Sequence, residues 1–144
     1  EITADFSSAP FQFRQLKDPK IKRLTSSNDI LGGPSSFNVV AATGKFRSEN
    51  PKLYKAFLDA LQEATDKINA DKPKYAKVFV DFTKSKLAPE FILEMMNSPE
   101  IRYTMAPEGT MKFAEFLHKV GTIKTMPSGW KDMFFPEIHG LQGS

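Results

Sequence analysis

Apolar and polar residues follow two different periods along this chain, and each period predicts a different element. A short apolar run rich in β-branched residues extends from Phe37 to Thr43, between a Gly-Gly-Pro turn and another glycine, which is typical of a buried strand. From Asn50 onward apolar residues recur every three or four positions, which indicates an amphipathic helix. Asn50 suits the N-cap and Pro51 the first turn of that helix. Residues 32–68 therefore predict a strand, a tight turn and a helix.

The rest of the chain predicts two more strands near its start and helices after residue 70. Alternation of polar and apolar residues favours strands over residues 1–6 and 21–25, with a short helix over residues 11–16 and a polar loop over residues 26–29. Three-and-four spacing predicts helices over residues 71–82, 89–96 and 107–120, with Asp71 as an N-cap and Gly121 as a C-cap. We therefore expect an α/β fold that is rich in helices after the strand at residues 37–43, with a fraying Gly-rich segment from residue 136 to residue 144.

Composition narrows the class of protein. The 144 residues are 40% hydrophobic and 26% charged, which is ordinary for a globular domain. No apolar run approaches the roughly 20 residues that cross a bilayer. The net charge of +3 is spread along the chain, and its densest basic cluster, residues 17–23, is interpreted as a solvated face, so we expect no nucleic-acid partner. Because cysteine is absent, disulfides and thiolate metal sites are excluded.

No catalytic or cofactor motif is present. The Gly32–Gly33 turn lacks the Lys-Ser/Thr of a phosphate-binding loop. His118 lies among Phe and Leu and is interpreted as a packed or surface histidine, and His139 lies in the tail. Glu90 and Glu94 have the spacing of solvated helix residues. We therefore expect neither an enzyme nor a metal or other cofactor.

Two stretches have residue types that suit recognition of a small molecule. In Phe6–Phe11, small hydroxyls follow a predicted strand and open a helix, and the free N–H groups at a helix start favour an anion. Simple N-capping explains the same residues equally well. The second stretch, Gly33–Asn38, is either a wall of the same cleft or a strand entry with no role beyond geometry.

At these stretches the chain resembles the solute-binding proteins of bacterial ABC importers, of the nitrate/sulfonate/taurine type. The order and spacing of several segments carry the resemblance, which covers nearly the whole chain: Ile2–Phe11, Gly32–Val40, Asn50–Phe57, Gly121–Lys124 and Trp130–Ile138.

The resemblance implies a periplasmic-binding-protein type II fold, in which two lobes close on a ligand and this chain is only the C-terminal part. Residues 1–31 would end the second lobe, residues 32–44 would include the hinge-crossing strand, and residues 45–144 would be the helical part of the first lobe. The implied ligand, a small anion or a heterocycle, would contact two groups of residues: Ser7, Ser8 and Phe11, and Ser36, Phe37 and Asn38. The implied partners are a membrane permease and the missing N-terminal portion, and the implied location is the periplasm or a lipid tether outside the cell.

Two other functions remain open. Pyrimidine-precursor synthases of thiamine biosynthesis share this scaffold, but they need a reactive histidine and a cysteine-rich metal cluster, and this chain has no cysteine. A helical protein-interaction module is the other alternative. The apolar helix faces outnumber the strands available to cover them, so we expect a fragment of only these residues to dimerise, exchanging the segment before Gly32, or to pack on the missing portion.

Overall fold

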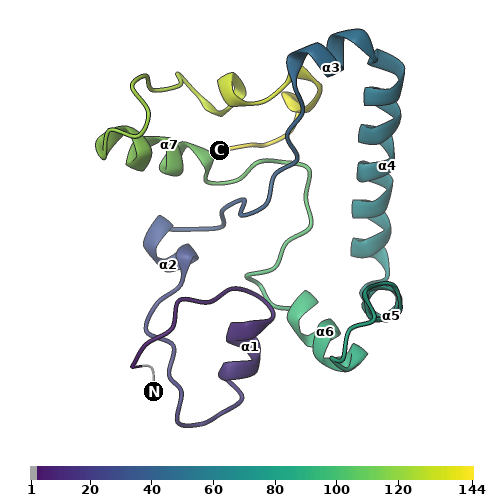
Figure 1. Ribbon diagram of the computed structural model, residues 1–144, viewed down its shortest axis with the longest axis vertical. Helices are drawn as coiled ribbons and strands as arrows, with labels where there is room; N and C mark the ends of the chain where they lie inside the picture. The colour runs from purple at the N-terminus through teal and green to yellow at the C-terminus, as the bar shows by residue number, and fades with distance from the viewer. Residues whose placement is uncertain (1–2) are drawn as a thin grey trace. The chain divides into compact units, whose positions relative to one another are not determined.

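The computed structural model describes residues 3–144, and regular structure in this range is entirely helical (Figure 1). There are seven α-helices and two short 3-10 helices in the described residues. In chain order they are α1 (Phe11–Gln15), α2 (Ser27–Leu31), α3 (Gly44–Glu49), α4 (Pro51–Ala70), α5 (Lys72–Thr83), α6 (Pro89–Met96), α7 (Thr110–Lys119), η1 (Trp130–Met133) and η2 (Pro136–Ile138).

The predicted α/β fold, and with it the type II binding-protein architecture, is wrong. Residues 3–144 contain no strand. Residues 21–25 and 37–43 are irregular, residues 1 and 2 of the first predicted strand lie outside the described range, and the polar loop predicted over residues 26–29 is mostly helix α2. The physical reason is that an apolar β-branched run makes a strand only when a neighbour pairs with its backbone. Phe37, Val39 and Val40 are instead exposed and have no ladder partner.

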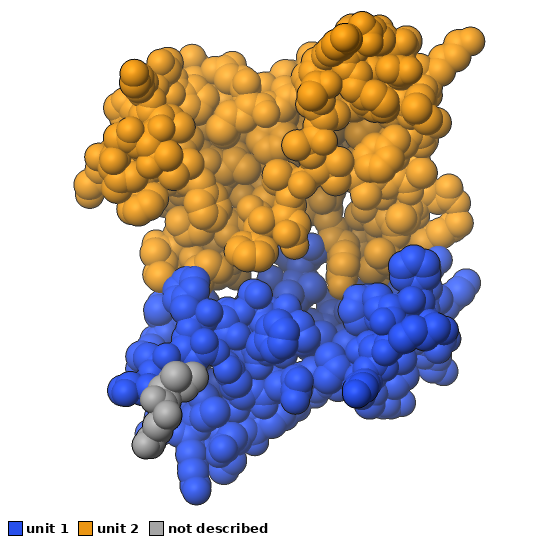
Figure 2. Space-filling view, in the orientation of Figure 1, with its two compact units in different colours: residues 1–26, 71–102 blue, residues 27–70, 103–144 orange. Residues whose placement is uncertain are grey.

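The chain divides into two compact units (Figure 2). Unit 1 comprises residues 1–26 and 71–102, and unit 2 comprises residues 27–70 and 103–144.

Unit 1 is organised by the packing of α5 on α6. Its buried side chains are Ala76, Ile92 and Met96, all on these two helices. The predicted start of α5 is confirmed, since the side chain of Asp71 accepts a hydrogen bond from the Lys74 N–H at 3.1 Å. Such a cap satisfies one of the donors left free at a helix start.

The end of α5 adopts a conformation that is unusual for its residue type. Lys84 has φ 53° and ψ 36°, in the left-handed region, and it is the only residue other than glycine with positive φ in the described part of the chain. The next residue, Ser85, donates its N–H to the carbonyl of Val80 at 3.1 Å. A helix end with a left-handed residue and a bond of this kind is common, but the left-handed residue is usually glycine.

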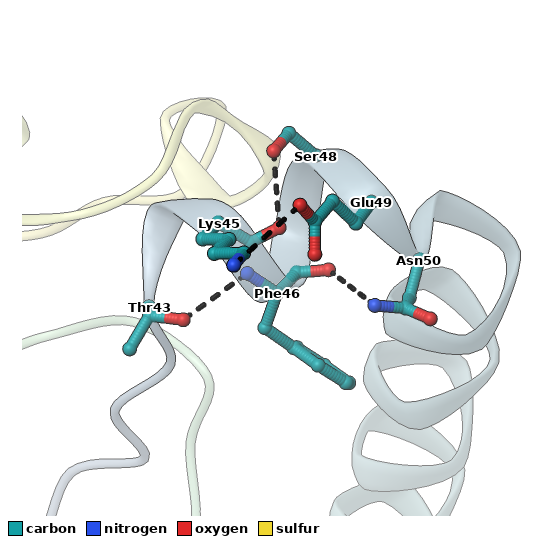
Figure 3. A network of polar contacts seen from close by, with 6 residues as sticks. All are labelled: Thr43, Lys45, Phe46, Ser48, Glu49 and Asn50. Atoms are coloured by element: carbon teal, nitrogen blue, oxygen red, sulfur yellow. Dashed lines mark hydrogen bonds and ion pairs between the residues drawn. The ribbon is translucent and has the colours of Figure 1, made fainter.

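Unit 2 begins its longest helical stretch at Thr43, where the structure differs from the prediction (Figure 3). Gly44 was expected to end a strand, but it begins α3, because the Thr43 hydroxyl accepts the N–H of Phe46 at 3.1 Å. Asn50 was expected to cap α4 with its side chain. Its amide instead donates to the carbonyl of Phe46 at 3.2 Å and so closes α3, while its own carbonyl accepts the N–H of Tyr54 at 2.9 Å. Asn50 therefore joins two consecutive helices.

Helix α4 carries interactions along its own surface. Lys55 bonds to Asp59 at 2.6 Å, Gln62 bonds to Asp66 at 2.9 Å, and Glu63 pairs with Lys67. Each pair spans one helical turn, where side chains four residues apart are neighbours. These contacts stabilise α4 from within the helix.

An aromatic cluster ties α3 and α4 to the later part of unit 2. The Arg47 guanidinium lies 5.1 Å from the centroid of the Phe135 ring and 6.0 Å from that of Tyr54, which is the buried residue of α4. Arg47 also pairs with Glu137 at 2.7 Å. The rings of Tyr54 and Phe135 meet edge to face at 6.0 Å, a favoured aromatic geometry.

The predicted helix over residues 107–120 is confirmed in a shorter form, and so is its C-cap. Gly121 has φ 79°, its N–H bonds to the carbonyl of His118 at 3.0 Å, and the N–H of Thr122 bonds to the carbonyl of Leu117 at 2.8 Å. This pair of bonds is the Schellman motif. Residues 136–144 were expected to fray. They instead form η2 and end at Ser144, whose N–H bonds to the carbonyl of Pro107 at 2.9 Å.

Few apolar side chains are buried within the described residues, and many are exposed. The buried ones are Tyr54, Ala76, Ile92, Met96 and Ala114. Several aromatic residues on the helices remain open to solvent, among them Phe57, Phe79, Phe82 and Phe116. No helix among the described residues is both long and apolar enough to cross a membrane.

Candidate functional site

The first predicted recognition stretch leads into α1 in unit 1. The main-chain oxygen of Ser8 accepts the N–H groups of Phe11 and Gln12, at 2.8 and 3.4 Å, so the carbonyl of Ser8 opens the helix and its hydroxyl does not cap it. Ser7 is half-buried and Ser8 is exposed. Neither hydroxyl has a hydrogen-bond partner within residues 3–144.

One face of α1 borders an open depression with a volume of about 370 Å³. Its lining residues are Phe11, Arg14 and Gln15, which share a face because they are spaced three and four positions apart on a helix. The Phe11 side chain, one of the predicted ligand residues, is 57% exposed. The depression thus brings together an aromatic ring, a guanidinium group and an amide.

The charge of Arg14 has no counterpart in the described part of the chain. The other arginines, at positions 23, 47 and 102, all have interaction partners. Three carboxylates of unit 1 are engaged by groups other than Arg14: Asp5 accepts a hydrogen bond from the Gln15 amide, Asp18 accepts the Lys20 N–H, and Glu94 of α6 pairs with Lys17 at 2.5 Å. An exposed, planar guanidinium without a carboxylate partner is suited to bidentate recognition of an anion.

The second predicted stretch lies in unit 2, and the three predicted ligand contacts in it, at residues 36–38, have different environments. Ser36 bonds twice to Glu108: its N–H donates to the Glu108 carbonyl at 2.7 Å, and its hydroxyl accepts the Glu108 N–H at 3.0 Å. Phe37 is 80% exposed, and Asn38 is exposed without a side-chain partner among residues 3–144. The Ser36 hydroxyl is therefore committed to the backbone, whereas Phe37 and Asn38 are accessible.

The structure describes the two predicted groups in separate units, and within unit 1 it adds two residues that sequence reasoning missed. Ser7, Ser8 and Phe11 belong to unit 1, and the group at residues 36–38 belongs to unit 2. Arg14 and Gln15 accompany Phe11 on the depression. A signal for them was present in the sequence, since positions three and four residues after an exposed aromatic share its helix face.

Neither histidine takes part in the depression. His118 is exposed on α7. The Nε2 atom of His139 lies 2.8 Å from the Phe134 carbonyl, and its ring meets the edge of Trp130 at 5.7 Å. His139 therefore has a packing role in the tail. Within residues 3–144 no cluster of His, Asp and Glu side chains has the composition of a metal site.

The titratable groups with perturbed pKa values in residues 3–144 all belong to unit 2, whereas α1 belongs to unit 1. The Arg47 side chain bonds to Glu137 and lowers the pKa of that carboxyl, and Lys67 does the same for the pKa of Glu63. Burial raises the pKa of Tyr103 and, with a smaller contribution from the Glu137 charge, the pKa of Tyr54. All four are explained by structural contacts of unit 2.

Comparison with models of protein families gave no match, and comparisons with curated proteins and with solved structures gave no significant similarity.

Proposed function

We propose that this chain belongs to a solute-binding component of an ABC importer and contributes a contact for a small anion or an anionic heterocycle. The observation that supports it is the depression on α1, where Arg14 carries an uncompensated positive charge beside the exposed ring of Phe11. The proposal does not depend on an α/β fold. It depends on these side chains and on the order of the segments that resemble the importer proteins.

The three lining residues offer complementary contacts to such a solute. A guanidinium donates two parallel hydrogen bonds to a carboxylate, sulfonate or nitrate group. An exposed phenyl ring provides a flat apolar surface for a heterocycle. Because the Gln15 amide nitrogen already bonds to Asp5, its oxygen remains as an acceptor. The depression is open and only these three residues line it, so they provide a contact for a solute and do not enclose it.

Binding is followed by transfer to a permease, and no covalent bond is made or broken. The protein would act outside the cytoplasmic membrane, where capture precedes transport. The hydroxyls of Ser7 and Ser8, which belong to the same unit as the depression, remain proposed contacts. Phe37 and Asn38 are exposed in unit 2 and stay predictions from the sequence.

Isothermal titration calorimetry tests the proposal with nitrate, methanesulfonate, benzenesulfonate and nicotinate as probes. Arg14→Gln should weaken binding by roughly tenfold or more, because a hydrogen bond to a charged group contributes about 1.5–3 kcal/mol. Lys20→Gln is the matched control, since it removes the same charge from an exposed residue of unit 1 that has no side-chain partner in residues 3–144. Absence of heat with every probe, or equal affinity of the Arg14 variant and wild type, would contradict the proposal.

A second candidate function, a protein-interaction module, is favoured by the exposed apolar side chains. Phe57 on α4 and Phe116 on α7 are both in unit 2, and both are exposed. Sedimentation velocity between about 1 and 100 μM tests self-association, one form of such interaction. A sedimentation coefficient that rises with concentration, and that falls back in a Phe116→Ser variant, would support it. A constant monomer value would contradict self-association.

A further inference from the structure

The last residues of the described chain are held by a set of specific contacts. The Ser144 main-chain oxygen accepts the N–H and the hydroxyl of Thr110, at 2.7 and 2.6 Å, and its hydroxyl accepts the Gly109 N–H at 2.9 Å. Gly143 lies against the indole of Trp130 so closely that a Cβ atom there would be 2.6 Å from Cε2 of the ring. His139 meets the same indole at its edge. We call residues 139–144 the strap.

The turn that receives the strap also holds the predicted ligand segment. Glu108 lies between the strap-bound residues Pro107 and Gly109, and it makes both hydrogen bonds to Ser36. Gly109 has φ 64°, and a Cβ atom at this position would lie 2.9 Å from the Pro34 carbonyl oxygen. The turn at residues 107–110 is therefore fixed from one side by the strap and from the other by residues 34–36.

We propose that the strap is a positioning element: when it docks on Trp130 and on the turn at residues 107–110, it sets the placement of Ser36 and of the exposed Phe37 and Asn38 that follow. Contacts run from the Gly143–Trp130 packing through Ser144 to Gly109 and Glu108, and from there to Ser36. Every hydrogen bond in this series uses main-chain groups or hydroxyls. The coupling is a property of unit 2, and it does not require that a solute binds.

Gly143→Ala is the test, measured by amide hydrogen exchange of the whole chain. The φ of Gly143 is outside the left-handed region, so an alanine causes no backbone strain and acts only through its clash with Trp130. Amide exchange at Gly109 and Thr110 should become about tenfold faster, which corresponds to the net contribution of one hydrogen bond. The coupling predicts a similar acceleration at the Ser36 and Glu108 amides.

Three controls separate coupling from general loosening. Gln142→Ala alters an exposed strap residue whose side chain makes no hydrogen bond or ion pair within residues 3–144, and it should leave all four amides unchanged. In a Trp130→Leu background, Gly143→Ala should add little, because the clashing indole is gone. Amides in the middle of α4, which belongs to the same unit, should keep the wild-type rate in every variant.

Two results would overturn the proposal. One is acceleration at Gly109 and Thr110 with wild-type exchange at Ser36 and Glu108, and the other is no acceleration at any of the four. If Gly143→Ala unfolds unit 2 as a whole, Ser144→Ala decides, because it removes only the hydroxyl that accepts the Gly109 N–H. About threefold faster exchange at Gly109 and Ser36 is then expected, and unchanged exchange at Ser36 would refute the coupling.

Discussion

The left-handed conformation of Lys84 gives a sharp prediction about stability. A side chain with a Cβ atom costs roughly 1–2 kcal/mol in this region, and Lys84 has φ 53°. Glycine avoids that cost but loses about 0.5–1 kcal/mol more backbone freedom on folding than other residues do. The difference predicts that Lys84→Gly is more stable than Lys84→Ala by about 0.5–1 kcal/mol. Both variants lose the same charge, so the comparison isolates the backbone.

Lys86 provides the matched control for this prediction. It is exposed, lies two residues further along the same connection, and does not have positive φ. At this position the order should reverse, with Lys86→Gly less stable than Lys86→Ala by about 0.5–1 kcal/mol, because only the loss of backbone freedom remains.

Thermal unfolding followed by far-ultraviolet circular dichroism measures both pairs. For a chain of this size a change of 1 kcal/mol in stability moves the melting temperature by roughly 2–4 °C. The glycine variant should therefore melt about 2 °C above the alanine variant at position 84 and about 2 °C below it at position 86. If glycine raises or lowers the melting temperature at both positions alike, the strain argument is refuted and Lys84 is not held in the left-handed region in solution.

Three further outcomes are expected. Thr43→Ala should cost about 1 kcal/mol and speed exchange in the first turn of α3, whereas Thr43→Ser keeps the capping oxygen and should not. Ile92→Ala, at a side chain that is 3% exposed, should destabilise unit 1 by about 2–5 kcal/mol, and Val78→Ala, at an exposed α5 position, by far less; equal urea midpoints would contradict this. The hydrogen bond from Arg47 to the Glu137 carboxylate lowers the pKa of Glu137 in the folded state. The stability that this bond gives the fold is therefore present above pH 4.5 and is lost as the pH falls through the lowered pKa. A melting curve series from pH 6 to pH 2 should show a loss of about 0.5 kcal/mol that is absent in Glu137→Gln.

Helix ends that depend on neighbouring residues could be predicted from the sequence. Asp71 caps α5 and Gly121 closes α7 as expected, because each acts on backbone groups within a few residues. The run from Phe37 to Thr43 was misjudged, since its pattern describes a strand but does not supply a partner strand. Gly44 was likewise expected to end a strand, so the role of Thr43 as an N-cap was missed. The Thr43 hydroxyl caps a helix that begins at Gly44.

The candidate site was predictable only in part. Phe11 was identified from its place beside small hydroxyls, and it lines the depression. Arg14 was missed because what distinguishes it is the lack of a carboxylate partner. The carboxylates of Asp5 and Glu94 are engaged by other groups, and no local sequence pattern reveals that. The hydrogen bond from the Thr110 N–H to the Ser144 main-chain oxygen joins residues that are 34 positions apart, and main-chain atoms give no residue-type signal in the sequence.

The pairs along α4 have a consequence for the order in which this chain acquires structure. Isolated helices become stable in water only beyond about 12–15 residues, and α4 has 20. Its pairs at Lys55–Asp59, Gln62–Asp66 and Glu63–Lys67 are all internal, so they are available as soon as these residues leave the ribosome. Helix α4 can thus begin to form during synthesis, before Phe135 exists to pack on Tyr54, and offer a preformed surface to the residues that follow.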